Sequence, residues 1–521
     1  MPNANALSPA DRPVWDRFHA GVRPAHADGP AAPPLNAYSE TLFTLGAQAF
    51  LANQAAQAET LLRMCLGAGG NDFAALGVLA LIAIERKDHA AAEGWLCAAL
   101  VLQPDEPTTL NNLGEALRQQ DRYDEAIACY ARATTLVPDY AEAYDNWGCA
   151  LVMRGQPEAA LSYHRRAITL KRDLLVARER LGLVLVGLNR HEEGLRALRR
   201  GLALDPDVAK ARLSEAWVLL ALGRFALGWK ALEARWVPRA DGSPVVDRHG
   251  DHPRWRGRGR LAGRTIVLHA EQGNGDTIQF VRYAPLLARQ GARVIVEVQQ
   301  SLVTLLRSLA AVDTVVPMDA DLPPFDLHCP LMSLPLACRT TLETIPAEVP
   351  YIATPPDRLA AWQQRLGPSP VGKRRIGLAW SGNADHAQNR ARSVPLERLA
   401  PLLHRTDCEF HVALTPMAPA DRAALEALPQ VIDHSAALRD FADTAALLSH
   451  MDLVLSVDTS VAHLAGALAR PTWVLLPFSA EWRWLIGRAD SPWYPTARLF
   501  RQARTGDWDS VVRAVMEALN A

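Results

Sequence analysis

A period of 34 residues runs through the first half of this 521-residue chain and constrains its fold more than any other feature. In six successive frames, the eighth and the twentieth residue is always glycine or alanine. The eighth residues are Gly46, Ala80, Gly114, Gly148, Gly182 and Ala216. Small residues at two fixed positions allow two helices to approach closely, so each frame predicts a helical pair that stacks on the next pair.

Prolines mark the ends of several frames. Pro104, Pro138 and Pro206 occupy the thirty-second position, where a proline ends the second helix because it lacks the helical N–H. The period, the small residues and the prolines together resemble tetratricopeptide repeats. We therefore expect an α-helical solenoid of six such repeats over residues 39–242, preceded by an irregular or disordered segment at 1–38. The concave surface of such a solenoid typically binds a partner protein.

Two asparagines occupy the sixth position of adjacent frames. The side-chain amides of Asn112 and Asn146 can both donate to and accept from a peptide main chain. Their position is similar to that of the asparagine ladder that holds the acceptor protein in O-GlcNAc transferase, and this resemblance implies acceptor binding. Polar residues exposed on helices would give the same pattern, so both interpretations stand.

Composition and charge exclude several classes of protein. The chain has 55 Lys and Arg against 56 Asp and Glu, and 49% of its residues are hydrophobic, which is typical of a globular protein without nucleic-acid affinity. Its seven cysteines form no CxxC pair, and its first residues lack a secretory signal. The longest apolar run, residues 74–84, is shorter than the ~18 residues of a spanning helix. We expect a soluble, cytoplasmic protein without a membrane span.

The second half changes from helical periodicity to short apolar runs. A stretch rich in proline, glycine and arginine separates the halves and is typical of a solvated connector. Within it we assign the linker to residues 243–263. Strand-like runs follow at residues 265–270, 293–298, 375–380, 410–414, 453–457 and 472–477. Strands that alternate with helices indicate parallel sheets. A proline-rich region divides the runs, so we expect two Rossmann-like lobes, at 264–370 and 371–521, facing a cleft.

Ligands of parallel sheets bind beyond the carboxyl ends of strands, so the loops there carry the functional signal. Residues 458–471 (DTSVAHLAGALARP) resemble the DTGxxHLAAAxxxP signature of glycosyltransferase family nine, the heptosyltransferases, with Ser460 where glycine is usual. Gly275 and Asp276 resemble the GD motif of that family's amino lobe, and residues 392–395 resemble its basic segment. With EWRWL at 481–485 and SPWYP at 491–495, the chain resembles bacterial proteins that fuse tetratricopeptide repeats to this transferase. The resemblance implies the two-lobed GT-B fold.

Two motifs supply the candidate chemistry. Asp276 is the candidate base for the acceptor hydroxyl, although an acidic residue that stabilises a helix N-terminus would look the same. After Asp458, the N–H groups around Thr459 and Ser460 form an anion site suited to phosphate, and His463, one turn further on, can hydrogen-bond the phosphate or the sugar. The expected donor-binding residues of the two motifs are Gly275, Asp458, Thr459, Ser460 and His463. The structural alternative for this second motif is a helix N-cap followed by a core histidine.

Further donor-binding candidates follow the first strand of the carboxy lobe. Arg392 would supply positive charge to the departing phosphates, whereas Arg390 fits a solvated basic loop equally well. Ser381, Gly382 and Asn383 directly follow that strand and would line the donor with backbone amides and short side chains. An ordinary turn is the alternative for these three residues.

The sequence thus predicts a glycosyltransferase that moves a sugar from a nucleotide-sugar donor to an acceptor. The resemblance implies an inverting reaction that uses neither a metal nor another cofactor. A protein recruited by the repeats is the expected acceptor, and a flagellin-like protein is one candidate. Two alternatives remain: a lipopolysaccharide-type glycosyltransferase, and a non-catalytic tetratricopeptide scaffold with a degenerate transferase domain.

Overall fold

The computed structural model describes residues 37–69, 72–206, 208–237, 247–369, 371–383 and 389–521. Most of the segment predicted to be irregular, residues 1–38, lies outside this part of the chain. The chain forms two compact units. The first holds the residues up to Leu188 together with Arg196–Leu204, and the second holds Asn189–Leu195 and Asp205–Ala521.

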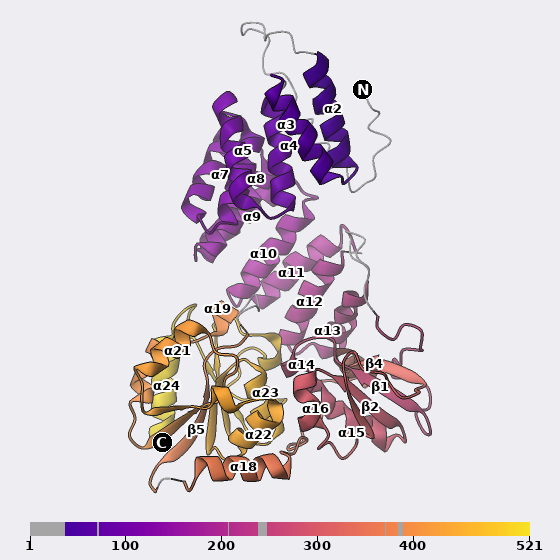
Figure 1. The fold of residues 1–521 in the computed structure, drawn as a ribbon, viewed down its shortest axis with the longest axis vertical. Helices are drawn as coiled ribbons and strands as arrows, with labels where there is room; N and C mark the ends of the chain where they lie inside the picture. Colours follow the sequence, from indigo (N-terminus) through magenta and orange to yellow (C-terminus); the bar gives the residue numbers. More distant parts are fainter. Residues whose placement is uncertain (1–36, 70–71, 207, 238–246, 370, 384–388) are drawn as a thin grey trace. The chain divides into compact units, whose positions relative to one another are not determined.

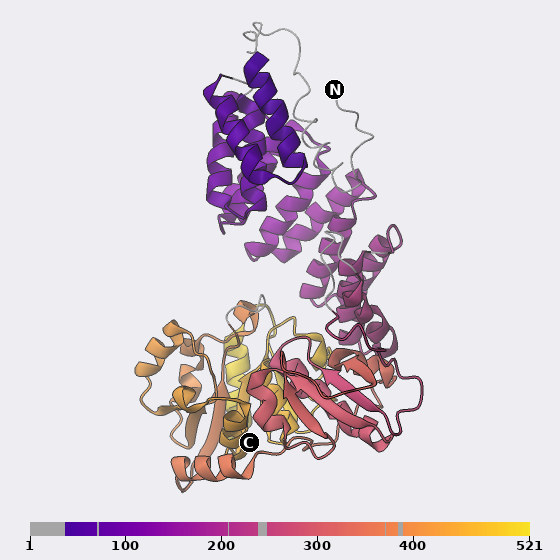
Figure 2. The same ribbon diagram turned by 45° about the vertical axis from the view of Figure 1, so that its right-hand side comes forward.

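Stacked helical pairs build the first unit (Figure 1). Its helices are α2 (Ala37–Leu51), α3 (Ala55–Gly67), α4 (Asp72–Glu85), α5 (His89–Leu102), α6 (Pro107–Arg118), α7 (Tyr123–Leu136), α8 (Ala141–Met153), α9 (Pro157–Leu170), α10 (Leu175–Gly187) and the last part of α11 (His191–Leu202). Figure 2 shows each pair stacked on the next along this series. Each pair begins within two residues of a predicted frame, which confirms the helical solenoid.

The small residues act as the repeat pattern requires. A Cβ atom on Gly114 would lie 2.6 Å from the ring of Tyr130, and one on Gly148 would lie 2.7 Å from the ring of His164. Tyr130 and His164 are fully buried on the second helix of the same pair. The eighth position is therefore small because the second helix fills that space with a large side chain.

This packing predicts opposite effects for two glycine substitutions in the solenoid. Gly114→Ala should lower the free energy of unfolding by ~1–3 kcal/mol, because the methyl group collides with Tyr130. Gly94→Ala should raise it by up to ~1 kcal/mol, because Gly94 lies exposed inside α5, with no atom near its missing Cβ, and alanine favours the helix. Thermal unfolding followed by far-UV circular dichroism compares the two variants. Shifts of the same sign would contradict this packing.

Two parallel sheets form the core of the second unit. The first has the order β3–β2–β1–β4, with β1 (Thr265–His269), β2 (Arg293–Val298), β3 (Thr314–Pro317) and β4 (Leu327–Pro330). The second has the order β10–β9–β8–β5–β6–β7, with β5 (Arg374–Ala379), β6 (Cys408–Val412), β7 (Val431–Asp433), β8 (Leu453–Val457), β9 (Thr472–Leu476) and β10 (Ala497–Arg501). Helices separate these strands along the chain, so the predicted pair of parallel α/β lobes is confirmed.

The strand order marks where a ligand would bind. In the six-stranded sheet the chain runs from β5 outward to β7 on one side, and from β8 outward to β10 on the other. The strands β5 and β8 are therefore neighbours whose following loops diverge, which opens a crevice at their carboxyl ends. Asp458 directly follows β8, and Ser381 lies two residues after the end of β5. In the four-stranded sheet the equivalent place lies between β1 and β4.

The sixth helical pair belongs to the second unit. The helices α12 (Ala209–Ala221) and α13 (Phe225–Leu232) carry Phe225 and Trp229, which are buried in the same hydrophobic core as the strands. The Trp229 indole N–H donates to the carbonyl of Thr340 at 3.1 Å, and its ring packs edge-on against Trp482 at 5.3 Å. The last division between the compact units thus lies at residues 204–205, before α12, whereas we expected it in the linker at 243–263. The aromatic side chains of the last pair pack on Phe280, Trp482 and Trp493, which belong to the second unit.

Only some of the described part of that linker behaves as a solvated connector. Trp255 is buried, and its backbone N–H donates to the carbonyl of His328 in β4 at 2.8 Å. Arg254 lies beside it in an ion pair with Asp247. Arg248 lies 3.3 Å from Glu297 of β2, whereas Arg256, Arg258 and Arg260 are exposed, as expected of a solvated connector. Residues 238–246 lie outside the described part of the chain.

Candidate active site

The loop after β1 presents Asp276 at the start of helix α14 (Asn274–Phe280). One carboxylate oxygen of Asp276 accepts a hydrogen bond from the backbone N–H of Gly273 at 3.0 Å, which caps the helix. The other oxygen accepts from the guanidinium of Arg483. The carboxylate is 18% exposed, so it caps the helix and still reaches the surface of the site.

Gly275 brings the two predicted motifs together. The helix α14 lies beside α23 (Ser460–Ala467), as Figure 1 also shows. A Cβ atom on Gly275 would lie 3.0 Å from the imidazole of His463 and 3.5 Å from the Cα of Ser460. Any side chain at this position would push the two helices apart. The GD motif and the motif after β8, far apart in the sequence, therefore meet through a glycine.

The N-terminus of α23 lies at the carboxyl end of β8. Thr459 is its N-cap, and the Thr459 hydroxyl accepts from the N–H of Val461 at 3.3 Å. The first N–H groups of a helix have no acceptor within the helix, and the helix dipole places positive potential there. Thr459 is thus a structural cap, as one interpretation expected, and the same geometry suits an anion.

Aromatic side chains fix His463 in the core behind this helix end. Its Nδ1 lies 2.9 Å from the Tyr494 hydroxyl, and its ring stacks on Trp484 with centroids 5.5 Å apart. Burial lowers the pKa of His463 well below its usual value, and the nearby guanidinium groups of Arg483, Arg282 and Arg392 lower it further. His463 is therefore neutral at physiological pH and is oriented by the protein.

Asp458 is the buried carboxyl group beside His463. One of its oxygens lies 3.9 Å from His463 Nε2. Burial raises the pKa of Asp458, while the charges of Arg483 and Arg392 act in the opposite direction. Neither Asp458 nor Asp276 belongs to a group of side chains that could hold a metal ion in the part of the chain that the structure describes.

Arg392 lies directly over the loop that follows β5. It ends the short helix α19 (Asn389–Arg392), and a Cβ atom on Gly382 would lie 2.6 Å from the Arg392 Nη2. The Nε of Arg392 is buried, and no hydrogen-bond partner for it exists among the described residues. A buried guanidinium nitrogen without a partner is suited to an anionic ligand. The structure thus brings Arg392 together with Gly382 and places both near Asp458.

The other candidates of these two segments differ in their exposure. Ser381 is half-buried beside Gly382, while Asn383 is exposed. Arg390 is also exposed, in keeping with the interpretation that it belongs to a solvated loop.

Sequence reasoning assigned no role to Arg483, which joins the two lobes. It lies in the 3-10 helix η6 (Trp482–Trp484) of the carboxy lobe and forms ion pairs with Asp276 of the amino lobe and with Glu481. Its Nε also donates to the Gln279 side chain in α14 at 2.6 Å. In the sequence, Arg483 was noticed only as part of the EWRWL segment at 481–485, and that segment does not reveal which side chains Arg483 contacts.

Glu481 is the second residue that sequence reasoning missed. Burial, the largest influence, raises the pKa of Glu481 to about 7; Arg483 opposes this rise and the charge of Asp458 adds to it. A carboxyl group with such a pKa can gain or lose a proton near neutral pH. The site therefore contains two carboxyl groups, Asp276 and Glu481, that share one guanidinium.

The two asparagines of the solenoid differ in their surroundings. The amide of Asn146 donates to the Asn111 side chain at 3.0 Å, and its oxygen accepts from Arg180 at 3.2 Å. Asn112 is half-buried on α6, and no hydrogen bond of its side chain occurs within the described residues. Asn112 is therefore the better candidate to face a peptide, since Asn146 already uses its amide within the repeat.

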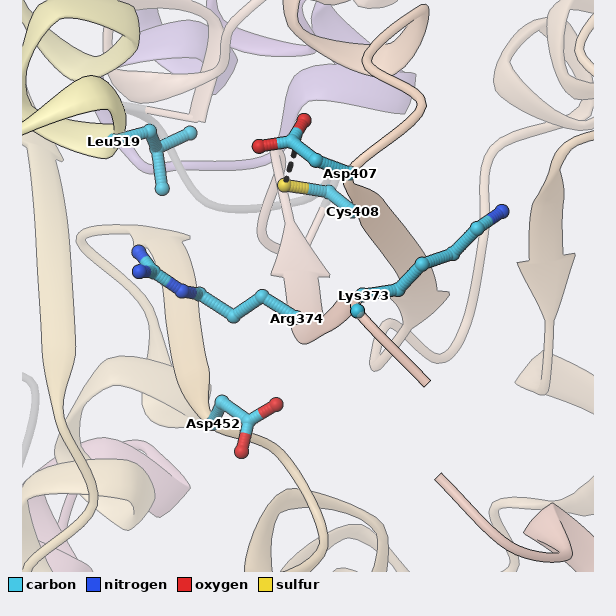
Figure 3. Close-up of a pocket in the computed structure, with 7 residues that line it drawn as sticks. Lys373, Arg374, Asp407, Cys408, Asp452 and Leu519 are labelled. Atoms are coloured by element: carbon cyan, nitrogen blue, oxygen red, sulfur yellow. Dashed lines mark hydrogen bonds between the residues drawn. The ribbon is translucent and has the colours of Figure 1, made fainter. Parts of the chain in front are cut away.

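A separate cavity lies at the opposite edge of the six-stranded sheet (Figure 3). It has a volume of about 450 Å³, and Arg374, Cys408 and Asp452 line it where β5, β6 and β8 begin. Figure 3 shows the Cys408 thiol directed at the Asp407 carboxylate, which also pairs with Arg405. Because this cavity is at the amino ends of the strands, it is distinct from the candidate site at their carboxyl ends.

Comparisons with known families match both halves of the chain. The tetratricopeptide repeat family matches residues 105–173 and 179–244. Glycosyltransferase family 9 (heptosyltransferase) matches residues 397–484, a segment that includes Asp458, His463 and Arg483. The chain thus combines tetratricopeptide repeats with a family 9 segment, which is the layout predicted from the sequence.

One similar curated protein is Protein FlbA of Caulobacter vibrioides, which is 27% identical over 325 residues. The match covers 56% of this chain and 51% of that protein, so the chain spans about half the length of this relative.

Solved structures resemble parts of the chain. A tetratricopeptide protein of Thermus thermophilus is 21% identical, with a TM-score of 0.31, over 35% of this chain and 99% of that one. The pilF protein of Pseudomonas aeruginosa is 19% identical, with a TM-score of 0.34, over 37% and 88% of the two chains. Within the described residues, no helix combines the length and the apolar character needed to cross a membrane.

Proposed function

We propose that the protein is a glycosyltransferase that moves a sugar from a nucleotide-sugar donor to an acceptor. The observation that carries this proposal is the convergence of three loops on one place. The loop after β1 supplies Asp276, the loop after β5 lies under Arg392, and the loop after β8 supplies the N-terminus of α23. An acid–base group and two sources of positive potential are what the transfer of a sugar from a diphosphate requires.

The donor diphosphate would bind between Arg392 and α23. The charge of Arg483 is compensated by Asp276 and Glu481, whereas Arg392 forms no ion pair within the described residues. Arg392 and the N–H groups of α23 therefore offer the uncompensated positive potential of the site. Such groups stabilise the negative charge that develops on the departing diphosphate, which lowers the barrier to transfer.

The acceptor hydroxyl would deliver its proton to Asp276. Both oxygens of Asp276 already accept one hydrogen bond, from Gly273 and from Arg483. A carboxylate oxygen has a second lone pair, so the hydroxyl of the acceptor can donate a hydrogen bond to either oxygen. Attack from the face opposite the diphosphate would invert the anomeric carbon. We infer that Arg483 positions Asp276 for this step and that Glu481 sets how tightly Arg483 holds it.

Protonation of Glu481 should therefore change the rate near neutral pH. Above its pKa of about 7 the Glu481 carboxylate shares Arg483 with Asp276, and below this pH that charge is lost. We expect kcat to fall as the pH decreases through about 7. The guanidinium of Arg483 then pairs with Asp276 alone, and this stronger ion pair makes Asp276 a poorer proton acceptor. The Glu481→Gln variant should have a low kcat at every pH and should not show the fall around pH 7. A parent profile that is flat around pH 7 would contradict the role of Glu481.

The repeats are proposed to recruit a protein acceptor, with a flagellin-like protein as one candidate. The exposed surface of a tetratricopeptide solenoid suits an extended peptide, and Asn112 has an amide available for one. A cell extract supplied with a radiolabelled nucleotide sugar distinguishes the acceptor classes. Label in protein supports this proposal, label in lipid supports the lipopolysaccharide alternative, and no transfer from any donor supports the scaffold alternative.

Asn112→Ala should lower the labelling of the protein acceptor several-fold without changing hydrolysis of the donor. The substitution removes an amide that can bind a peptide main chain, and it leaves the transferase lobes intact. Thr135→Ala is a matched control, because Thr135 is an exposed polar residue on the second helix of the same pair. Equal labelling by both variants would remove Asn112 from acceptor recognition.

A further inference from the structure

A cluster of histidine and carboxylate side chains lies on one face of the four-stranded sheet, outside the site described above. His269 ends β1, and the strand register pairs it with Glu297 in β2. His328 in β4 pairs with Val267 and so lies on the same face as His269. Side chains alternate along a strand, so Ile266 and Leu268 lie on the opposite face. The segment that follows residue 246 covers this face and adds His249 to the cluster.

The side chains of the cluster are close enough to share one ion. His249 Nε2 lies 2.8 Å from a Glu297 oxygen, and His269 Nε2 lies 3.1 Å from His328 Nδ1. One ligand atom from each of His249, His269 and Glu297 lies within 4.8 Å of the others. A second group, Asp247 with His269 and His328, meets the same limit. Both carboxylates pair with an arginine, but Arg254 lies 2.5 Å from Asp247 whereas Arg248 lies 3.3 Å from Glu297, so Glu297 is the more easily released.

His269 has a buried ring nitrogen without a partner. The side chain is only 2% exposed, and Nδ1 makes no hydrogen bond within the described residues. The other ring nitrogen, Nε2, lies 3.1 Å from His328 Nδ1. An imidazole with one nitrogen bonded to a neighbouring group and the other nitrogen open has the form of a metal ligand.

We propose that His249, His269 and Glu297 bind a divalent transition-metal ion, with zinc as the best match, and that His328 orients His269 behind it. Two imidazoles and one carboxylate are a donor set that suits zinc and leaves a fourth position for water. Arg248 now lies 3.3 Å from Glu297 and would have to give way to the ion.

The proposed ion would have a structural role. It would fasten the segment containing His249 to the strands β1 and β2. It would also hold the carboxyl end of β1, from which the loop to Gly273 and Asp276 departs. The metal is therefore separate from the sugar transfer, and its binding can be tested by itself.

Zinc titration of the full chain tests this proposal. The protein is produced without a polyhistidine tag, stripped with a chelator and titrated with Zn²⁺ in competition with a chromophoric chelator. We expect one high-affinity zinc per chain. His249→Gln and Glu297→Gln should each weaken binding at least ~10-fold. Co²⁺ bound to the parent should show the visible absorption of a low-symmetry site, and this absorption should be lost in His249→Gln.

His252→Gln is the matched control, because His252 is exposed in the same segment and stacks on Phe325 outside the ligand set. It should bind zinc as the parent does. His249 is partly exposed, so its substitution is compatible with folding, and circular dichroism verifies this. A parent that binds no stoichiometric zinc would overturn the proposal, and so would equal affinities for the parent and His249→Gln.

Discussion

Asp276→Asn should lower kcat at least ~100-fold while the affinity for the nucleotide-sugar donor stays within about twofold of the parent. Asparagine keeps the size of the side chain and one acceptor oxygen, but it cannot take a proton from the acceptor hydroxyl. Donor affinity is preserved because Asp276 lies in the amino lobe, whereas the proposed phosphate contacts come from Arg392 and α23. Single-turnover rates and calorimetric donor titration measure the two quantities separately.

The loss of a helix cap has to be distinguished from the loss of a base. Asp440 caps α22 (Phe441–Ser449) by accepting from the N–H groups of Ala442 and Asp443, so Asp440→Asn reports the cost of the same change at another helix. Both variants should lose up to ~1–2 kcal/mol of stability, but only Asp276→Asn should lose turnover. Undiminished turnover in Asp276→Asn would remove Asp276 from the reaction.

Arg392→Ala should weaken donor binding by about 10- to 100-fold, which corresponds to the ~1.5–3 kcal/mol of a hydrogen bond to a charged group. The Nε of Arg392 has no partner among the described residues, so removal of the side chain leaves no broken hydrogen bond there and the fold should be retained. Arg390→Ala on the same short helix is the control, because Arg390 is exposed and should contribute little. Equal affinities of the two variants in calorimetry would mean that Arg392 does not contact the donor.

Much of the fold follows from local sequence pattern. The helical pairs were predictable because the small residue at the eighth position repeats, and the reason lies within each pair, as Gly114 and Tyr130 illustrate. The strands β1, β2 and β8 were predictable because each contains three consecutive apolar residues. The strands β3 and β7 have only four and three residues, which is too short for a periodic signal, and only their pairing with neighbours defines them.

The site was predictable only as far as its motifs extend. Gly275 and Asp276 were found from one motif and His463 from another, but the contact between Gly275 and His463 arises from the approach of two lobes. Arg483 and Glu481 were missed for the same reason: a raised pKa and an ion pair across the lobes depend on burial and partners, not on residue type. The position of the sixth helical pair was missed because Trp229 packs on Phe280, Trp482 and Trp493, which lie far from it in the sequence.

A crystal structure of the protein with a bound nucleoside diphosphate would show whether the donor phosphates bind at the carboxyl ends of β5 and β8. A calorimetric panel of nucleoside diphosphates first identifies one that binds. We expect its phosphates to contact Arg392 and the N–H groups at the start of α23, at the carboxyl ends of β5 and β8. Phosphates bound elsewhere, for example in the cavity beside Arg374 and Cys408, would contradict the account, and so would the failure of every nucleotide to bind.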